Sequence, residues 1–191
     1  MLSKGPTIVS GCHLRRNCRS GGQVTVTDIQ IRPARDSDVP AIVAMTHELA
    51  AYERAPEQCH LTTGQLRTAL FCDQPAVFAH VATGRVGGAE PKPLGFALWF
   101  LNFSTWEGAH GIYLEDLYVS PQARGTGLGR RLLATLAAIC VERGYRRLDW
   151  WVLHWNPARD FYAAIGANAM DDWIPHRIEG GPLARLAQPV D

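Results

Sequence analysis

The chain has 191 residues, of which 47% are hydrophobic and 19% charged, and this composition excludes collagen-like, disordered and coiled-coil proteins in favour of one soluble globular domain. The formal net charge is +1, and the excess of basic residues falls within residues 1–30, so the remainder lacks the basic character of a nucleic-acid-binding module. The longest apolar runs, 94–101 and 132–141, are far shorter than the roughly 20 residues of a membrane-spanning helix.

The first 28 residues differ in composition from the rest of the chain. Residues 1–28 are rich in Gly, Ser, Arg and Thr and show little hydrophobic periodicity, which is typical of a flexible extension. Regular patterning begins at Ile29, so we expect one folded domain over residues 29–191. The cysteines are five, an odd number with no CxxC pair, which favours a reducing cytoplasm over a secreted, disulfide-bonded context.

Two helices and four strands are predicted between Ile29 and Val119. Ile29 and Ile31 alternate with polar residues as in a strand, and the acidic stretch 36–38 can cap a helix that starts with Pro40 in its first turn. Thr62 and Gln65 have the spacing of a capping box for a second helix. Three strands are then expected, at Ala76–Thr83, Leu94–Phe103 and Ile112–Val119.

The remaining third of the chain predicts a long helix followed by shorter elements. Apolar positions from Leu128 to Cys140 form a one-sided stripe, and Gly144 closes this helix. A strand at Leu148–Leu153, a helix at Ala158–Ile165 and a final strand at Ala169–Ile178 follow. The order is strand, helix, helix, three strands, helix, strand, helix and strand, which indicates an α/β (α+β) sandwich with a mixed, mostly antiparallel sheet flanked by helices.

A glycine-rich segment lies between the third of those consecutive strands and the long helix. Its residues are Arg124, Gly125, Thr126, Gly127, Leu128, Gly129 and Arg130. Glycines at alternate positions before a helix N-terminus allow backbone N–H groups to face phosphate oxygens. The spacing is G-x-G-x-G rather than the dinucleotide pattern G-x-G-x-x-G, and no phosphate-binding lysine motif is present.

With Arg124, this segment reads R-x-x-G-x-G and resembles the pyrophosphate-binding signature of the GNAT superfamily of acetyl-coenzyme A-dependent N-acetyltransferases. Further motifs resemble the diamine (spermidine/spermine) and thialysine N-acetyltransferases of that superfamily, over roughly residues 29–187. They are Tyr113–Val119, Tyr52–Gln58, Trp155-Asn156, Phe161-Tyr162 and Met170–Trp173. The resemblance implies the GNAT fold and acetyl-CoA as the co-substrate.

The resemblance implies a set of coenzyme-binding residues. The glycine-rich segment, Arg124 to Arg130, would hold the pyrophosphate, and Asn156 would bind the pantetheine arm. Leu117, Tyr118 and Val119 would meet the coenzyme through the strand, with the N–H groups of Leu117 and Val119 exposed to it. Exposed donors of this kind require a local break in strand pairing, so we expect a bulge within Ile112–Val119.

The same resemblance implies two catalytic residues. An alkyl ammonium with a pKa near 10.4 is mostly protonated at neutral pH, so a base assists its reaction, and Glu115 is the candidate, through a water. Tyr162 is the candidate acid for the departing thiolate, because a tyrosine hydroxyl is protonated at neutral pH. Glu115 could instead form a salt bridge or hold the substrate cation, and Tyr162 could be a core aromatic.

Substrate recognition is expected from carboxylates, which attract an ammonium, and from aromatic rings, which add cation–π contacts. The candidates are Tyr52, Glu53, Glu115, Asp116, Trp150 and Asp171. Alternatively, about half of the acids are solvated and most tryptophans are core residues. Ser104 stands where diamine acetyltransferases usually carry an aspartate, which weakens the case for a long polyamine.

These observations predict a cytoplasmic enzyme that transfers acetyl from acetyl-CoA to a primary amine of a small molecule, such as a diamine, a polyamine or a lysine analogue like thialysine. The alternatives are a protein lysine or N-terminal acetyltransferase and a non-catalytic coenzyme A-binding sensor. We expect a homodimer, no bound metal, no nucleic-acid partner and no membrane association.

Overall fold

The computed structural model describes residues 25–189, which form two compact units, one ending at Asp149 and one beginning at Trp150. Each unit is described by itself. The predicted extension covers residues 1–28, of which residues 1–24 lie outside the described part of the chain. Its last residues belong to the first strand, which starts at Val26, three residues before the expected Ile29.

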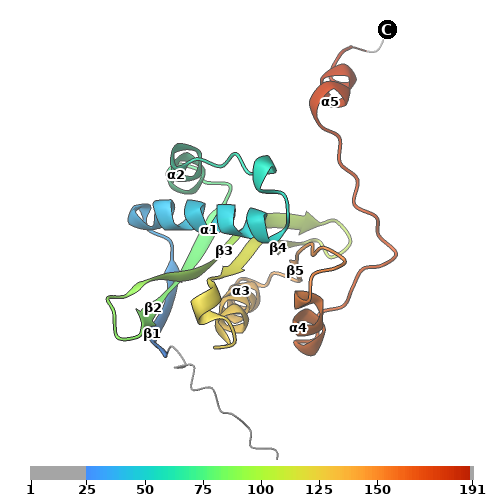
Figure 1. The fold of residues 1–191 in the computed structure, drawn as a ribbon. Helices are drawn as coiled ribbons and strands as arrows, with labels where there is room; N and C mark the ends of the chain where they lie inside the picture. Colours follow the sequence, from blue (N-terminus) through green and yellow to red (C-terminus); the bar gives the residue numbers. More distant parts are fainter. Residues whose placement is uncertain (1–24, 190–191) are drawn as a thin grey trace, which may run out of the picture. The chain divides into compact units, whose positions relative to one another are not determined.

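The first unit is built on a five-stranded sheet in the order β1-β2-β3-β4-β5 (Figure 1). The strands are β1 (Val26–Pro33), β2 (Phe78–Val86), β3 (Lys92–Ser104), β4 (Ala109–Val119) and β5 (Leu148–Asp149). The first four are antiparallel neighbours, and β5 runs parallel to β4. The mixed, mostly antiparallel sheet is therefore confirmed.

Three helices cover this sheet, with α1 (Val39–Tyr52) and α2 (Thr63–Phe71) on one face and α3 (Leu128–Arg143) on the other (Figure 1). Asp38 precedes α1 and forms an ion pair with Arg32 of β1 at 2.6 Å. The predicted capping box of α2 is present, because Thr62 Oγ1 accepts from the N–H of Gln65 while the Gln65 side chain accepts from the N–H of Thr62. Gly144 ends α3 in the left-handed conformation, as expected.

Each face of the sheet has its own buried layer. The cluster under α1 and α2 contains Ile42, Leu66, Phe96, Leu98 and Tyr118. On the other face, one side of α3 packs against the sheet, and it is the apolar stripe predicted from the sequence. The buried residues of α3 are Leu128, Leu132, Leu133, Leu136 and Cys140. These two layers fix β4 between the helices, so its outer edge is held in a defined position.

A β-bulge interrupts the pairing of β3 with β4. Trp99 pairs with Leu114 and Leu98 pairs with Asp116, so Glu115 is an extra residue without a partner of its own. An extra residue moves the following side chains to the opposite face of the sheet. Ile112 and Leu114 therefore face α3, whereas Tyr118 joins the cluster under α1. The bulge expected within Ile112–Val119 is confirmed.

The second unit contains α4 (Ala158–Ala164) and α5 (Gly180–Leu186). The helix expected at Ala158–Ile165 is confirmed, but two strand predictions need correction. The strand expected at Leu148–Leu153 is limited to Leu148–Asp149, and residues Ala169–Ile178 form no strand. A strand exists only where a neighbouring strand pairs with it, and the structure pairs no described residue with 169–178. Helix α5 was not expected, because Gly and Pro open its sequence.

Candidate active site

The outer edge of β4 is open beyond its second pair with β5. Only Ile112 and Tyr113 pair with Leu148 and Asp149, and no strand within residues 25–189 pairs with β4 after that point on this side. The backbone N–H and C=O groups of β4 that point to this side after Tyr113 have no partner strand among residues 25–189. An unpaired stretch of strand edge can form hydrogen bonds with an extended ligand.

The bulge decides which amides point outward along this edge. The Ile112 N–H donates to the Arg147 carbonyl at 3.0 Å, on the β5 side, and peptide directions alternate along a strand. Without the bulge the even-numbered residues would continue to face outward. The extra residue reverses the alternation: the Tyr118 carbonyl lies against Gly95 of β3, whereas the Val119 carbonyl accepts from Arg124 Nε at 3.1 Å on the other side. The N–H groups of Leu117 and Val119 therefore face the open edge.

The predicted phosphate-binding segment forms a tight turn that leads from β4 into α3. Gly125 and Gly127 both have φ of +78°, a left-handed conformation that glycine adopts without strain. Gly127 is the N-cap and supplies no side-chain cap, so the first N–H groups of α3, from Leu128 to Arg130, have no capping side chain. Open space surrounds the Cα atoms of Gly125 and Gly127. Uncapped N–H groups at the start of a helix are the kind of backbone donors that bind phosphate oxygens.

Arg124 lies between this turn and the end of α1. Its guanidinium carbon is 5.4 Å from the ring centroid of Tyr52 and 6.0 Å from that of Tyr118. The Tyr118 hydroxyl donates to Glu48 of α1, and burial, together with this carboxylate, raises the pKa of Tyr118 to about 12. Glu48 was missed by the sequence analysis, since nothing in the local pattern of α1 marks a contact with a residue 70 positions away.

Three carboxylates gather beside the bulge. Burial, followed by the charges of Glu115 and Glu53, raises the pKa of Asp116 to about 6. Burial also raises the pKa of Glu53, which follows the last residue of α1. Tyr52, at the same helix end, contacts Arg124 as described above. Four of the six predicted substrate-site residues (Tyr52, Glu53, Glu115 and Asp116) thus lie on adjoining segments of the first unit.

The other predicted residues belong to the second unit. The Tyr162 ring lies in α4 with its centroid 4.9 Å from that of Trp150 and 5.3 Å from that of Phe161. Asn156 Oδ1 accepts at 2.9 Å from the N–H of Ala158, the first residue of α4, whose N-cap is Pro157. Asp171 is exposed in a turn. Trp150 and Tyr162 are therefore brought together.

Two features are absent from the described residues. Across residues 25–189, no group of three or more His, Cys, Asp or Glu side chains is arranged to hold a metal ion. Within the same residues, every helix is too short or too polar to cross a bilayer.

Comparison with known proteins identifies the family of the chain. Residues 44–167 match the acetyltransferase (GNAT) family. The thialysine N-epsilon-acetyltransferase of Bos taurus is 33% identical over 168 residues, which are 83% of this chain and 97% of that protein. The spermidine/spermine N(1)-acetyltransferase-like protein 1 of Homo sapiens is 30% identical over 174 residues, which are 86% of this chain and 24% of that protein.

Among solved structures, an integron cassette protein from the mobile metagenome of V. cholerae has a TM-score of 0.69 and 28% identity, covering 85% of this chain and 99% of that chain. The predicted fold and the resemblance to acetyltransferases are thereby confirmed. The chain belongs to the GNAT family, whose members use acetyl-CoA as co-substrate, and it is an N-acetyltransferase.

Proposed function

We propose that this enzyme acetylates the terminal primary amine of a small molecule, with lysine analogues such as thialysine ahead of diamines and polyamines. The observation that carries the proposal is the position of three carboxylates, Glu53, Glu115 and Asp116, beside the outward amides of β4. An ammonium is attracted to such a cluster, and the reacting nitrogen would arrive next to the edge that receives the thioester.

The ranking of substrates rests on two further facts. The thialysine relative is 33% identical and matches over 97% of its own length, whereas the spermidine/spermine-like relative is 30% identical and is a longer protein of which the match spans 24%. Ser104 is buried and accepts from the Glu107 N–H at 3.2 Å, so its hydroxyl belongs to the β3–β4 turn. It supplies no charge for a second ammonium of a polyamine.

Coenzyme binding would use this chain's backbone more than its side chains. Acetyl-CoA supplies the activated acetyl thioester. The turn from Arg124 to Gly127 and the first N–H groups of α3, including Arg130, would bind the pyrophosphate, and Leu117 and Val119 would donate to the coenzyme along β4. Tyr118 would act through Arg124, because its side chain is buried under α1. Asn156 retains its Nδ2 donors for the pantetheine arm.

Proton transfer would involve one acid and one base. Glu115, exposed on the bulge, would remove the proton from the ammonium through water. Asp116, with its pKa raised to about 6, is ionised at neutral pH and would hold the substrate cation beside Glu115. Tyr162 would donate a proton to the departing thiolate. Tyr52 and Glu53 of the first unit would contribute to amine binding, and Trp150 and Asp171 are the amine-binding candidates of the second unit.

The decisive experiment is an acetyl-CoA turnover screen with thiol release as the readout. Thialysine, lysine, ornithine, diamines, spermidine, amino sugars and lysine-containing peptides are compared at equal concentration. We expect kcat/KM for thialysine or another lysine analogue to exceed that for spermidine by at least about tenfold. Preferential acetylation of peptides would favour a protein acetyltransferase, and coenzyme binding without turnover of any amine would favour a coenzyme A-binding sensor.

We also propose a cytoplasmic homodimer. Cys59, Cys72 and Cys140 are free thiols, which suits a reducing compartment. Two large apolar side chains of the first unit are largely exposed, Trp106 at 88% and Val141 at 83%, and burying such side chains at an interface would favour association with a second copy. Light scattering should give about twice the 21.0 kDa of one chain, and a value near 21.0 kDa at micromolar concentration would argue against the dimer.

A further inference from the structure

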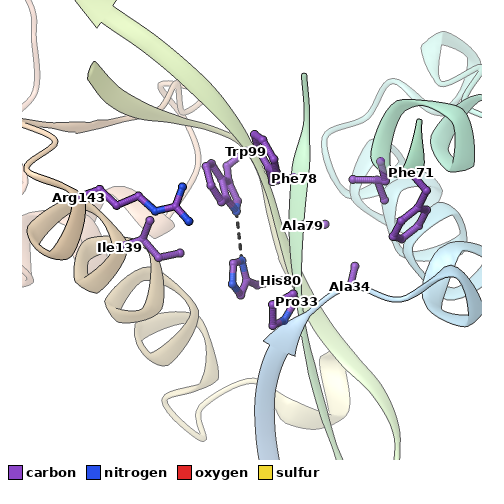
Figure 2. A pocket seen from close by; sticks show the side chains of 10 residues that line it. Pro33, Ala34, Phe71, Phe78, Ala79, His80, Trp99, Ile139 and Arg143 are labelled. Carbon is purple, nitrogen blue, oxygen red and sulfur yellow. Dashed lines mark hydrogen bonds between the residues drawn. The ribbon is translucent and has the colours of Figure 1, made fainter. Parts of the chain in front are cut away.

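A cavity of about 380 Å³ opens at the end of α3 that lies opposite the glycine-rich turn (Figure 2). It lies where β1 ends at Pro33 and leaves the start of β2 uncovered. We name this cavity the His80 pocket. The residues that line it on the α3 side are Phe78, His80, Trp99, Ile139 and Arg143. Helix α3 has 16 residues and is therefore about 24 Å long, so this pocket is separate from the coenzyme turn.

The wall of the His80 pocket is flat and aromatic. The Phe78 and Trp99 rings stack with centroids 4.7 Å apart and planes inclined by 29°. The His80 ring continues the stack on Trp99 at 6.1 Å and 21°. Ile139 and Arg143 extend from α3 towards these rings (Figure 2). A planar, apolar body suits such a wall better than a branched or strongly hydrated one.

The hydrogen bond between Trp99 and His80 determines which proton His80 carries. Trp99 Nε1 donates to His80 Nδ1 at 3.2 Å, and an indole nitrogen is only a donor, so Nδ1 is unprotonated. Burial lowers the pKa of His80, which keeps the ring neutral at neutral pH and leaves its proton on Nε2. The Nε2–H group has no hydrogen-bond partner among residues 25–189, so it is a donor available at the pocket.

Arg143 adds a positive charge to the same wall. Within the described part of the chain, its guanidinium forms no ion pair or hydrogen bond. A guanidinium binds a carboxylate through two parallel N–H donors. The pocket therefore combines an aromatic wall with two donor groups, the His80 Nε2–H and the cationic Arg143 guanidinium, and its lining contains no carboxylate that would attract a cationic ligand.

We propose that the His80 pocket binds a small aromatic carboxylate. The aromatic ring packs against the Phe78–Trp99 wall and Ile139, and the carboxylate accepts hydrogen bonds from Arg143 and from His80 Nε2–H. A neutral amide of the same shape leaves the Arg143 charge without a counter-ion, and an aromatic amine is repelled by it. This site is independent of the proposed amine substrate.

The test is a calorimetric titration of the full chain, saturated with coenzyme A, using 2-naphthoate as probe and 2-naphthamide as its neutral counterpart. Arg143→Gln removes the charge from an exposed position and should leave the fold intact. Arg146→Gln is the matched control, because Arg146 is exposed three residues further along and does not line the pocket. In parallel, Trp99→Phe identifies the indole N–H resonance of Trp99 in NMR spectra.

We expect 2-naphthoate to bind at least tenfold more tightly than 2-naphthamide and to shift the Trp99 indole resonance. Arg143→Gln should weaken 2-naphthoate binding by at least tenfold, whereas Arg146→Gln should leave it unchanged. Equal binding of the acid and the amide, unchanged binding in Arg143→Gln, or absence of 2-naphthoate binding to the coenzyme A-saturated chain would each overturn the proposal.

Discussion

At the scale of single residues, the side chains beside the bulge combine burial with like charge. Asp116 is partly buried near Glu115 and Glu53, and no cationic side chain of residues 25–189 forms an ion pair with it, so burial and the two like charges raise its pKa to about 6. Such an arrangement disfavours the folded state at neutral pH and favours the arrival of a cation. A bound ammonium would relieve the repulsion among these carboxylates, so the arrangement lowers the stability of the free protein and favours binding of a cation.

The variant Asp116→Asn tests whether this carboxylate lowers stability and promotes amine binding. A carboxyl group whose pKa is higher in the folded state destabilises the fold above about pH 6, and this penalty disappears as pH falls towards 4 and the group becomes protonated. Asp116→Asn should therefore raise the free energy of unfolding at pH 7.5 by about 1 kcal/mol and change it little at pH 4. Urea denaturation at both pH values measures this, and kcat/KM for the amine should fall about tenfold.

Glu115→Gln is the matched variant. It removes the neighbouring negative charge, so the pKa of Asp116 should fall, and a partial gain of stability at pH 7.5 is expected. If Glu115 is the base, the loss of kcat/KM should shrink as pH approaches the pKa of the amine. A loss that is the same at every pH would assign Glu115 to cation binding instead.

Tyr162→Phe addresses the proposed acid. The variant keeps the ring that packs near Trp150 and Phe161, so the melting temperature should change little. Removing the hydroxyl should lower kcat about a hundredfold without a matching change in KM. Steady-state kinetics with thialysine measures the split, and turnover close to that of the unmodified enzyme would leave Tyr162 with a packing role only.

At the scale of elements, the bulge of β4 and the turn into α3 place backbone donors on one open edge. The two left-handed glycines, Gly125 and Gly127, form the turn, and Arg124 ties it to α1 through Tyr52 and Tyr118. Gly129 differs from them: it lies inside the helix, and a methyl group there would touch Val119 Cγ2 at an ordinary 3.7 Å. Its presence in the motif is therefore not explained by backbone strain.

Gly127→Asp should weaken coenzyme binding at least about tenfold, because it adds a side chain and a negative charge where the pyrophosphate would bind. Gly144→Asp is the control, since Gly144 has φ of +69° and open space at the other end of the same helix. Both variants carry similar backbone strain, so only the difference between them reports on the site. Calorimetry with coenzyme A measures it, and equal affinities in the two variants would contradict the assignment.

The elements that the sequence predicts well are those with local signals. The capping box at Thr62, the left-handed Gly144 and the stripe of α3 each depend on residues a few positions apart. The strand at 169–178 was predicted wrongly because alternation does not provide a partner strand. Likewise, the contact of Tyr118 with Glu48 and the raised pKa of Asp116 join segments more than 60 residues apart, and one sequence contains no signal for such pairs.

At the scale of the whole molecule, the described residues form two units, and the family match over residues 44–167 includes parts of both. Residues 1–24 lie outside the described part and outside this match. We propose that the catalytic domain begins with β1, whose Val26 pairs with Val86 of β2, rather than at Ile29.

Deleting residues 1–24 should leave the melting temperature and kcat/KM nearly unchanged, because the ladder from Val26 onward is retained. Deleting residues 1–29 is the contrasting variant. It removes two pairs of the β1–β2 ladder, the Asp28–Arg85 ion pair at 3.3 Å and the Ile29 carbonyl that accepts from Arg131, and it should lower the melting temperature. Differential scanning calorimetry compares the two. Loss of activity in the shorter deletion would mean that the N-terminal arginines act on the active site.

The unpaired Glu115 has a consequence for how β4 tolerates insertions and deletions. Removing one residue between Leu114 and Leu117 would restore an uninterrupted ladder with β3, a change that a sheet alone would accept. If Glu115 is the residue removed, the pairs Trp99–Leu114 and Leu98–Asp116 become consecutive, so the later residues keep their faces and Tyr118 stays opposite Phe96. What a shortened strand would lose is the local bend and the Glu115 carboxylate at the edge, whereas the outward direction of the Leu117 and Val119 amides follows from their register with β3.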